Sequence, residues 1–159
     1  MSDRWDFYMC MVDGVLSSIF VDLGLRDAVP QPERPFCLRV GLRLLRDHPR
    51  GLSHADEVPA LDALEESLVE VVADRLDGVY EARITGGGGR RFYFHVGRDD
   101  PEALEACVAH VRTSAPDYPV ETDIHRDPGW RVYLDFLYPN RLGFQFIRAE
   151  GRSRWRAGR

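Results

Sequence analysis

The stretch from Phe36 to Leu44 alternates apolar and other residues, and this pattern restricts the fold more than any other feature of the chain. Arg39 and Arg43 stand between the apolar positions, which are Phe36, Leu38, Val40, Leu42 and Leu44. Successive side chains of a β-strand point to opposite faces of its sheet. The sequence therefore predicts a strand with one face in the core and one face that is wet and positively charged.

Two further pairs of strand-like runs are each joined by a short turn that contains glycine. Residues 5–12 and 15–22 are rich in aromatic and β-branched residues and flank Asp13-Gly14. An Asp-Gly pair accepts the positive φ angles that a type I′ hairpin turn requires. Residues 79–85 and 90–96 flank the run Gly86 to Gly89 in the same way. Both pairs are predicted to be antiparallel hairpins.

The four glycines, followed by Arg90 and Arg91, also invite comparison with a phosphate-binding loop. Such a loop needs a helix N-terminus directly after it, because the free N–H groups and the helix dipole hold the anion. The residues that follow alternate as a strand does, and the lysine and hydroxyl of a P-loop are missing. The pattern favours a hairpin turn over a phosphate site.

Three helices are expected from apolar stripes and capping residues. The first starts near Asp56 and carries a stripe that comprises Leu61, Leu64, Leu68, Val71, Val72 and Leu76. The second begins at Asp99 or Asp100, with Pro101 in its first turn. After a strand at residues 120–125, Asp127-Pro128 starts a third helix, which ends before Pro139. Residues 141–148 fit either a strand or a helix.

This order of elements predicts an α+β fold with mostly antiparallel sheet and helices on one face. The C-terminal half, from Val79 to Leu137, is compatible with a ferredoxin-like arrangement. We expect a single domain over residues 1–148, followed by a basic C-terminal tail over residues 149–159. A loop with Pro30, Pro32 and Pro35 precedes the alternating strand.

Composition excludes several classes of protein. With 159 residues, 44% of them apolar, the chain can bury a real core, and its net charge of −5 opposes binding to nucleic acid or anionic lipid. The cysteines Cys10, Cys37 and Cys107 form no CxxC pair, so we expect buried thiols and no disulfide framework. We find no membrane-spanning run and no signal peptide, and we expect a cytoplasmic protein without a cofactor.

A polar sheet face is the strongest candidate for chemistry. Glu121, Asp123 and His125 share one side of their strand, and Arg91, Tyr93 and His95 share one side of another. If these strands are neighbours, His95, Asp123 and His125 form a metal or acid-base set for a hydrolytic enzyme. The alternative is the solvated face of a half-covered sheet. The sequence shows no GxSxG or HExxH motif.

Nucleic-acid binding is a further hypothesis, through the hairpin arginines Arg90 and Arg91 and through the tail. The C-terminal end of the chain places Trp155 among the residues Arg148, Arg152, Arg154, Arg156 and Arg159. Aromatic and arginine side chains together can bind single-stranded nucleic acid. The alternative is a loosely held terminus behind an acidic body.

Several segments together resemble an uncharacterised bacterial family, the domain of unknown function number 695. They include SIFVDLGL at residues 18–25 and DPGWRVYLDFLYP at residues 127–139. The chain is also similar, more weakly, to ferredoxin-like regulators of ribonuclease E activity. That similarity implies a regulator that acts by binding a protein.

The aromatic residues of the second segment are the candidate binding residues for such a partner: Trp130, Tyr133, Phe136 and Tyr138. They cannot all lie on one helical stripe, so at least one is expected outside the core; packing against the N-terminal hairpin is the alternative to recognition. We rank a non-enzymatic, protein-binding or regulatory module first. A metal site or hydrolytic enzyme ranks second, and RNA binding ranks third.

Overall fold

The computed structural model describes residue 2 and residues 4–157, with side chains described as far as residue 150. Its centre is a six-stranded sheet in the order β1-β2-β4-β5-β3-β6, in which every neighbouring pair is antiparallel. The strands are β1 (Trp5–Val12), β2 (Val15–Asp22), β3 (Phe36–Arg43), β4 (Val79–Gly86), β5 (Gly89–Val96) and β6 (Val120–Arg126). The expected α+β fold with an antiparallel sheet is confirmed.

Both predicted hairpins form with left-handed turn residues. Asp13 and Gly14 have φ angles of 50° and 77°, and Gly87 and Gly88 have φ angles of 61° and 77°. Positive φ at both central positions belongs to the turns that match the twist of paired strands. Gly86 and Gly89 pair as the ends of β4 and β5, with Gly87 and Gly88 between them, so the run is a hairpin turn as predicted.

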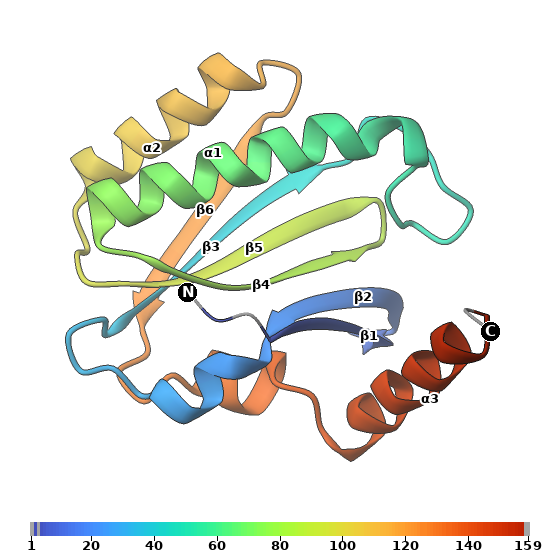
Figure 1. Ribbon diagram of the computed structural model, residues 1–159. Helices are drawn as coiled ribbons and strands as arrows, with labels where there is room; N and C mark the ends of the chain where they lie inside the picture. The colour runs from blue at the N-terminus through green and yellow to red at the C-terminus, as the bar shows by residue number, and fades with distance from the viewer. Residues whose placement is uncertain (1, 3, 158–159) are drawn as a thin grey trace.

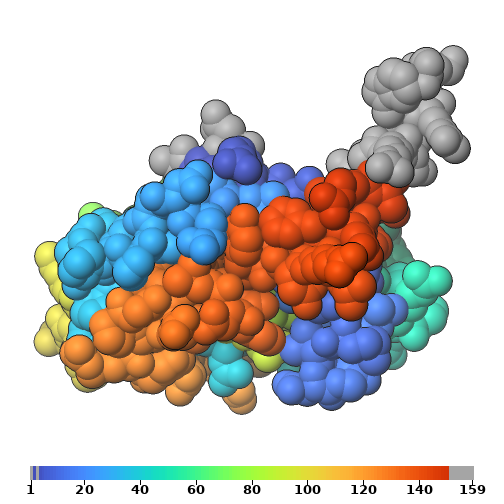
Figure 2. Space-filling model, turned by 90° about the horizontal axis from the view of Figure 1, so that it is seen from below, coloured from blue at the N-terminus to red at the C-terminus, as the bar shows by residue number. Residues whose placement is uncertain are grey.

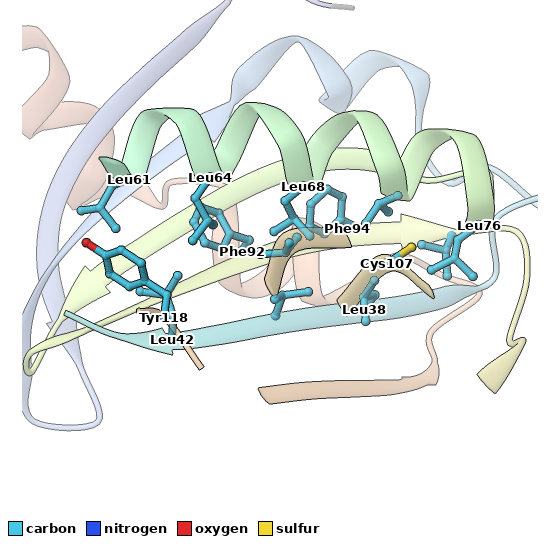
Figure 3. Packing of buried hydrophobic residues seen from close by; sticks show 14 residues of the cluster. Leu38, Leu42, Leu61, Leu64, Leu68, Leu76, Phe92, Phe94, Cys107 and Tyr118 are labelled. Atoms are coloured by element: carbon cyan, nitrogen blue, oxygen red, sulfur yellow. The ribbon is translucent and has the colours of Figure 1, made fainter. Parts of the chain in front are cut away.

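The helices α1 (Val58–Leu76) and α2 (Pro101–Ser114) cover one face of the sheet (Figure 1). A short 3-10 turn, η2 (Ala55–Glu57), leads into α1, and the Asp100 carboxylate accepts hydrogen bonds from the first N–H groups of α2. Leu61, Leu64 and Leu68 of α1 point onto the sheet, where they meet Phe92 and Phe94 of β5 (Figure 3). The predicted apolar stripe of α1 therefore packs against the sheet and encloses the main hydrophobic core.

The segment from Phe36 to Arg126 has the βαββαβ order of a ferredoxin-like fold. Within it the strands lie in the order β4-β5-β3-β6, and both crossover helices lie on the same face. The expected range of Val79 to Leu137 is therefore wrong, because the unit begins with β3 and its first crossover helix is α1. The hairpin β1-β2 extends this unit by pairing with β4.

Two irregular helical segments lie on the opposite face, which Figure 2 shows covered by the chain. These are a 3-10 helix, η1 (Leu23–Ala28), and a π-helical turn, η3 (Val132–Leu137), which replaces the α-helix expected after Asp127. With β1, β2, β4 and β5 they form a second core cluster around Trp130 and Tyr133. The expectation that the helices lie on one face therefore holds for α1 and α2, but not for η1 and η3.

Residues 141–157 form the helix α3 (Arg141–Ala157), which settles the alternative between strand and helix. α3 lies beside β1, where Phe146 contacts Phe7 with ring centroids 5.8 Å apart. A Cβ atom at Gly143 would stand 3.2 Å from Cδ2 of Tyr8, so the helix approaches β1 closely. The expected boundary between residues 148 and 149 falls inside this helix. None of the described helices is long and apolar enough to cross a membrane.

Candidate functional site

A β-bulge in β4 places a carboxylate inside the protein. Tyr80 pairs with Phe94 and Ala82 pairs with Tyr93, so Glu81 is an extra residue between two adjacent rungs of the ladder. Tyr80 packs on the helix-covered core and Ala82 belongs to the second core cluster. Bulges re-aim side chains in this way. Glu81 is fully buried, and its carboxylate reaches His95 of β5.

His95 lies between two carboxylates. Its Nδ1 atom is hydrogen-bonded to Oε1 of Glu81, and its Nε2 atom is 3.2 Å from Oδ2 of Asp127 and 3.1 Å from the carbonyl oxygen of Asp127. The ring of Trp130 stacks on the imidazole with centroids 4.0 Å apart. We name Glu81, His95 and Asp127 the buried triad.

The buried triad joins β4, β5 and the segment after β6. The Asp127 carboxylate also accepts hydrogen bonds from the N–H groups of Arg131 and Val132, at 2.9 and 3.0 Å, which confirms Asp127 as the start of a helical segment. Trp130 has a φ of 55°, a left-handed conformation that costs about 1 kcal/mol or more and must be held by its surroundings. The hydrogen bonds of the triad and the stacking of the Trp130 ring on His95 stabilise this conformation.

Burial governs the electrostatics of the triad. Burial raises the pKa of the Glu81 carboxyl above its usual value, although the hydrogen bond and the charge interaction with His95 lower it. Oε2 of Glu81 has no hydrogen-bond partner in the part of the chain that the structure describes. His95 and Glu81 are 0% exposed and Asp127 is 8% exposed. In this conformation no substrate can reach these groups, so they position the segment that follows β6.

The predicted metal set of His95, Asp123 and His125 is not assembled. The prediction requires β5 and β6 to be neighbouring strands, but β3 lies between them. Cys37 of β3 pairs with His95 on one side and with His125 on the other. His95 is occupied by the triad, whereas His125 lies 3.7 Å from Asp123 near the surface. No group of three or more His, Cys, Asp or Glu side chains among the described residues is placed to hold a metal ion.

The four aromatic candidates divide between the core and the surface. Trp130 and Tyr133 are 0% exposed, and Tyr133 donates a 2.6 Å hydrogen bond to the carbonyl oxygen of Asp22. Both residues therefore pack in the core, the alternative that the sequence left open. Phe136 is exposed and Tyr138 is half-buried, so these two remain accessible.

Arg90 and Arg91 point to opposite faces of the sheet, as neighbouring residues of a strand must. Arg90 lies on the helix side and is buried, whereas Arg91 lies on the other face and is partly exposed. They cannot act together on one nucleic acid strand. Arg148 is exposed, and the tail side chains from residue 152 onward lie outside the described residues.

A concave surface remains on the face that carries Arg91, beyond the cover of the C-terminal segment. This open-face groove, of about 440 Å³, is lined by both hairpin turns, β3 and the start of β6. Arg39 and Arg43 of β3 and Arg91 of β5 line it from the open face, Arg90 also borders it, and its acidic residues are Asp13 and Glu121. Gly41 lies at the centre and has no side chain, so the three arginines surround an open floor.

The sequence pattern predicts part of this arrangement. The alternation of β3 predicts the positive face with Arg39 and Arg43, and Arg91 is one of the predicted binding residues. Glu81 was missed, because in regular alternation it shares a face with Arg83, and only the bulge turns it away.

Comparisons with known proteins bear on the family alone. A family model described as "Family of unknown function (DUF695)" matches residues 3–138. No curated protein and no solved structure matches, so the weaker similarity to regulators of ribonuclease E finds no support. On the extent of the family match, the chain belongs to the DUF695 family.

Proposed function

We propose that this protein is a non-enzymatic, regulatory binding module that takes an acidic, extended segment of a partner protein into the open-face groove. The observation that carries the proposal is the group of three guanidinium side chains around Gly41. Arg39, Arg43 and Arg91 form no ion pair with any carboxylate that the structure describes, and all three line one groove. A guanidinium binds carboxylates through two parallel hydrogen bonds.

The residues best suited to acid-base chemistry support binding over catalysis. His95, Glu81 and Asp127 are enclosed, and their hydrogen bonds are made to each other and to backbone groups. The accessible groove presents three arginines and backbone groups, with Asp13 and Glu121 at its rim. Such a surface can hold an anionic partner.

The edge of the sheet favours an extended partner. In the described part of the chain β6 pairs only with β3, so its outer edge presents free backbone N–H and C=O groups beside the groove. Partner strands add to such edges, and alternate side chains then give specificity. Glu121 at the start of β6 and Asp13 at the opposite rim would oppose a uniformly acidic partner. The fitting segment therefore carries acidic residues at its centre.

The test compares partner capture by matched variants of the full chain. The variant Arg39→Glu, Arg43→Glu, Arg91→Glu reverses the groove charge, and Arg75→Glu, Arg112→Glu changes two exposed arginines of the helices α1 and α2 as a control. Quantitative mass spectrometry of captured proteins from a bacterial lysate should show one protein retained by the wild type and the control and lost by the triple variant.

Equal capture by the triple variant would contradict the proposal. Capture that disappears after nuclease treatment would instead favour RNA binding. Synthetic peptides that span the sequence of the captured partner are then tested for binding. The peptide that binds should be acidic, and its affinity should fall at high salt.

A further inference from the structure

The helix-covered face of the sheet is open at one end. α1 and α2 pack on β3, β4 and β5, whereas β1 and β2 extend beyond them (Figure 1). A cavity of about 440 Å³ lies there, between the β1-β2 hairpin and the loop that precedes α1. We name it the helix-side pocket. Met9, Phe20 and Leu52 contribute to its apolar lining, and Ser53, Thr85 and Arg90 to its polar lining.

Arg90 is a buried cation in this pocket without a directly bonded carboxylate among the described residues. It is 5% exposed, and its Nε and Nη2 atoms donate to the hydroxyls of Thr85 and Ser53 at 2.9 and 3.3 Å. No carboxylate among the described residues forms an ion pair with it, and the described lining of the pocket contains no Asp or Glu. Burial and the nearby charge of Arg83 lower the pKa of Arg90, and the more distant Glu65 and Asp62 offset this lowering only in part. A buried charge without a partner is costly.

Arg83, the other arginine of the pocket, differs in this respect. Its Nη1 atom bonds the two carboxylate oxygens of Glu65 at 2.9 and 2.7 Å, and its guanidinium lies over the ring of Phe20 at 4.6 Å. Glu65 thus bonds Arg83 directly, whereas it acts on Arg90 only from a distance. Nη1 of Arg90 has no hydrogen-bond partner in the described part of the chain, so it is free to bind a ligand.

We infer that the helix-side pocket binds a small organic anion with one oxyanion group, a carboxylate or a phosphate, on an apolar body. The guanidinium of Arg90 receives the oxyanion, with the hydroxyls of Ser53 and Thr85 beside it. The apolar body packs against Met9, Phe20 and Leu52. A volume of about 440 Å³ lies within the range typical of small-molecule sites.

This inference does not depend on the proposed function, because the two sites lie on opposite faces of the sheet. Arg39, Arg43 and Arg91 belong to the open-face groove. Arg90 also borders that groove, but its guanidinium bonds Thr85 and Ser53 on the helix side. The two sites can therefore be tested, and can fail, separately.

The experiment titrates the full chain with benzoate, 3-phenylpropanoate, octanoate and phenyl phosphate, by calorimetry and thermal shift. Acetate lacks the apolar body, and 3-phenylpropanamide lacks the charge. At least one apolar anion should raise the Tm and bind about tenfold more tightly than acetate or the amide. The carboxylates and phenyl phosphate together show which head group is preferred.

Variants locate the site. Arg90→Met should weaken the best anion about tenfold or more, while the control Arg39→Met on the other face leaves it unchanged. Ser18→Phe fills the pocket and keeps Arg90, and it should also abolish binding of the anion. This variant tests the site if Arg90→Met does not fold. No shift with any of the four anions would overturn the inference. Binding that survives Arg90→Met or Ser18→Phe would also overturn it.

Discussion

Arg91 of β5 lies directly across from Gly41 of β3, and a Cβ atom added to Gly41 would stand 3.9 Å from Cγ of Arg91. The absence of a side chain at position 41 is what keeps the floor of the open-face groove bare. The groove is therefore sensitive to one residue that carries no chemistry of its own.

The variant Gly41→Val should block the groove and keep the fold. Its Cβ meets only an ordinary contact, and valine suits a strand better than glycine by about 0.5–1 kcal/mol. We expect an unchanged or slightly higher Tm together with the loss of partner capture. Retained capture with a folded protein would place the partner elsewhere.

The buried triad should matter for stability and not for binding. Glu81→Ala leaves His95 without one of its two carboxylate partners and should lower the free energy of unfolding by about 3 kcal/mol. Glu81→Gln keeps a hydrogen-bonding group and should cost less. Urea unfolding measures both values. If Glu81→Gln abolished partner capture while stability held, the triad would have a direct functional role.

Glu57 should make stability depend on pH in the acid range. Burial alone would raise the pKa of this carboxyl, but hydrogen bonds from the N–H of Leu45, the hydroxyl of Tyr118 and the N–H of Arg46 hold it below the usual 4.5. A carboxyl whose pKa is lower in the folded than in the unfolded protein stabilises the fold at pH values above its unfolded pKa. This stabilisation is lost as the pH falls through its folded pKa. The wild type should therefore lose stability below about pH 4.5.

The matched variant Glu57→Gln tests this assignment. It should be less stable than the wild type at pH 7, and its free energy of unfolding should fall less steeply below about pH 4.5. Parallel pH profiles for the two proteins would show that other carboxyls govern the acid transition.

Gly51 should tolerate substitution less well than Gly14, although both have positive φ angles of 68° and 77°. A Cβ atom at Gly51 would stand 2.7 Å from the backbone nitrogen of Gly87, whereas nothing lies within 4 Å of one at Gly14. Gly14→Ala should cost about 1 kcal/mol for backbone strain alone. Gly51→Ala should cost more, because the turn at Gly87 must also move. Equal losses would show that the contact is unimportant.

The sequence predicted those parts of the fold whose signals are local. The Asp13-Gly14 turn, the alternation in β3 and the leucine stripe of α1 each act within a few residues, and each is present as expected. Residues 141–148 could not be assigned, because their helix is defined by packing against β1.

The candidate site was harder to predict because it depends on strand order and on a bulge. His95 and His125 were placed on the correct strands, but the sequence does not state that β3 separates them. Glu81 is aimed at His95 by one extra residue in β4, and no local pattern marks that bulge. Asp127 was identified as a helix start, and its second contact, with His95, depends on the tertiary fold.

Photo-crosslinking from the groove tests the central claim most directly. A crosslinking amino acid replaces Glu121 at the groove rim in one protein and Arg112 on the surface of α2 in another. The account predicts crosslinks from position 121 to an acidic, extended segment of the captured partner, and none from position 112. Crosslinks from position 112 with none from position 121 would show that the partner binds on the helix side of the sheet, and would contradict the account.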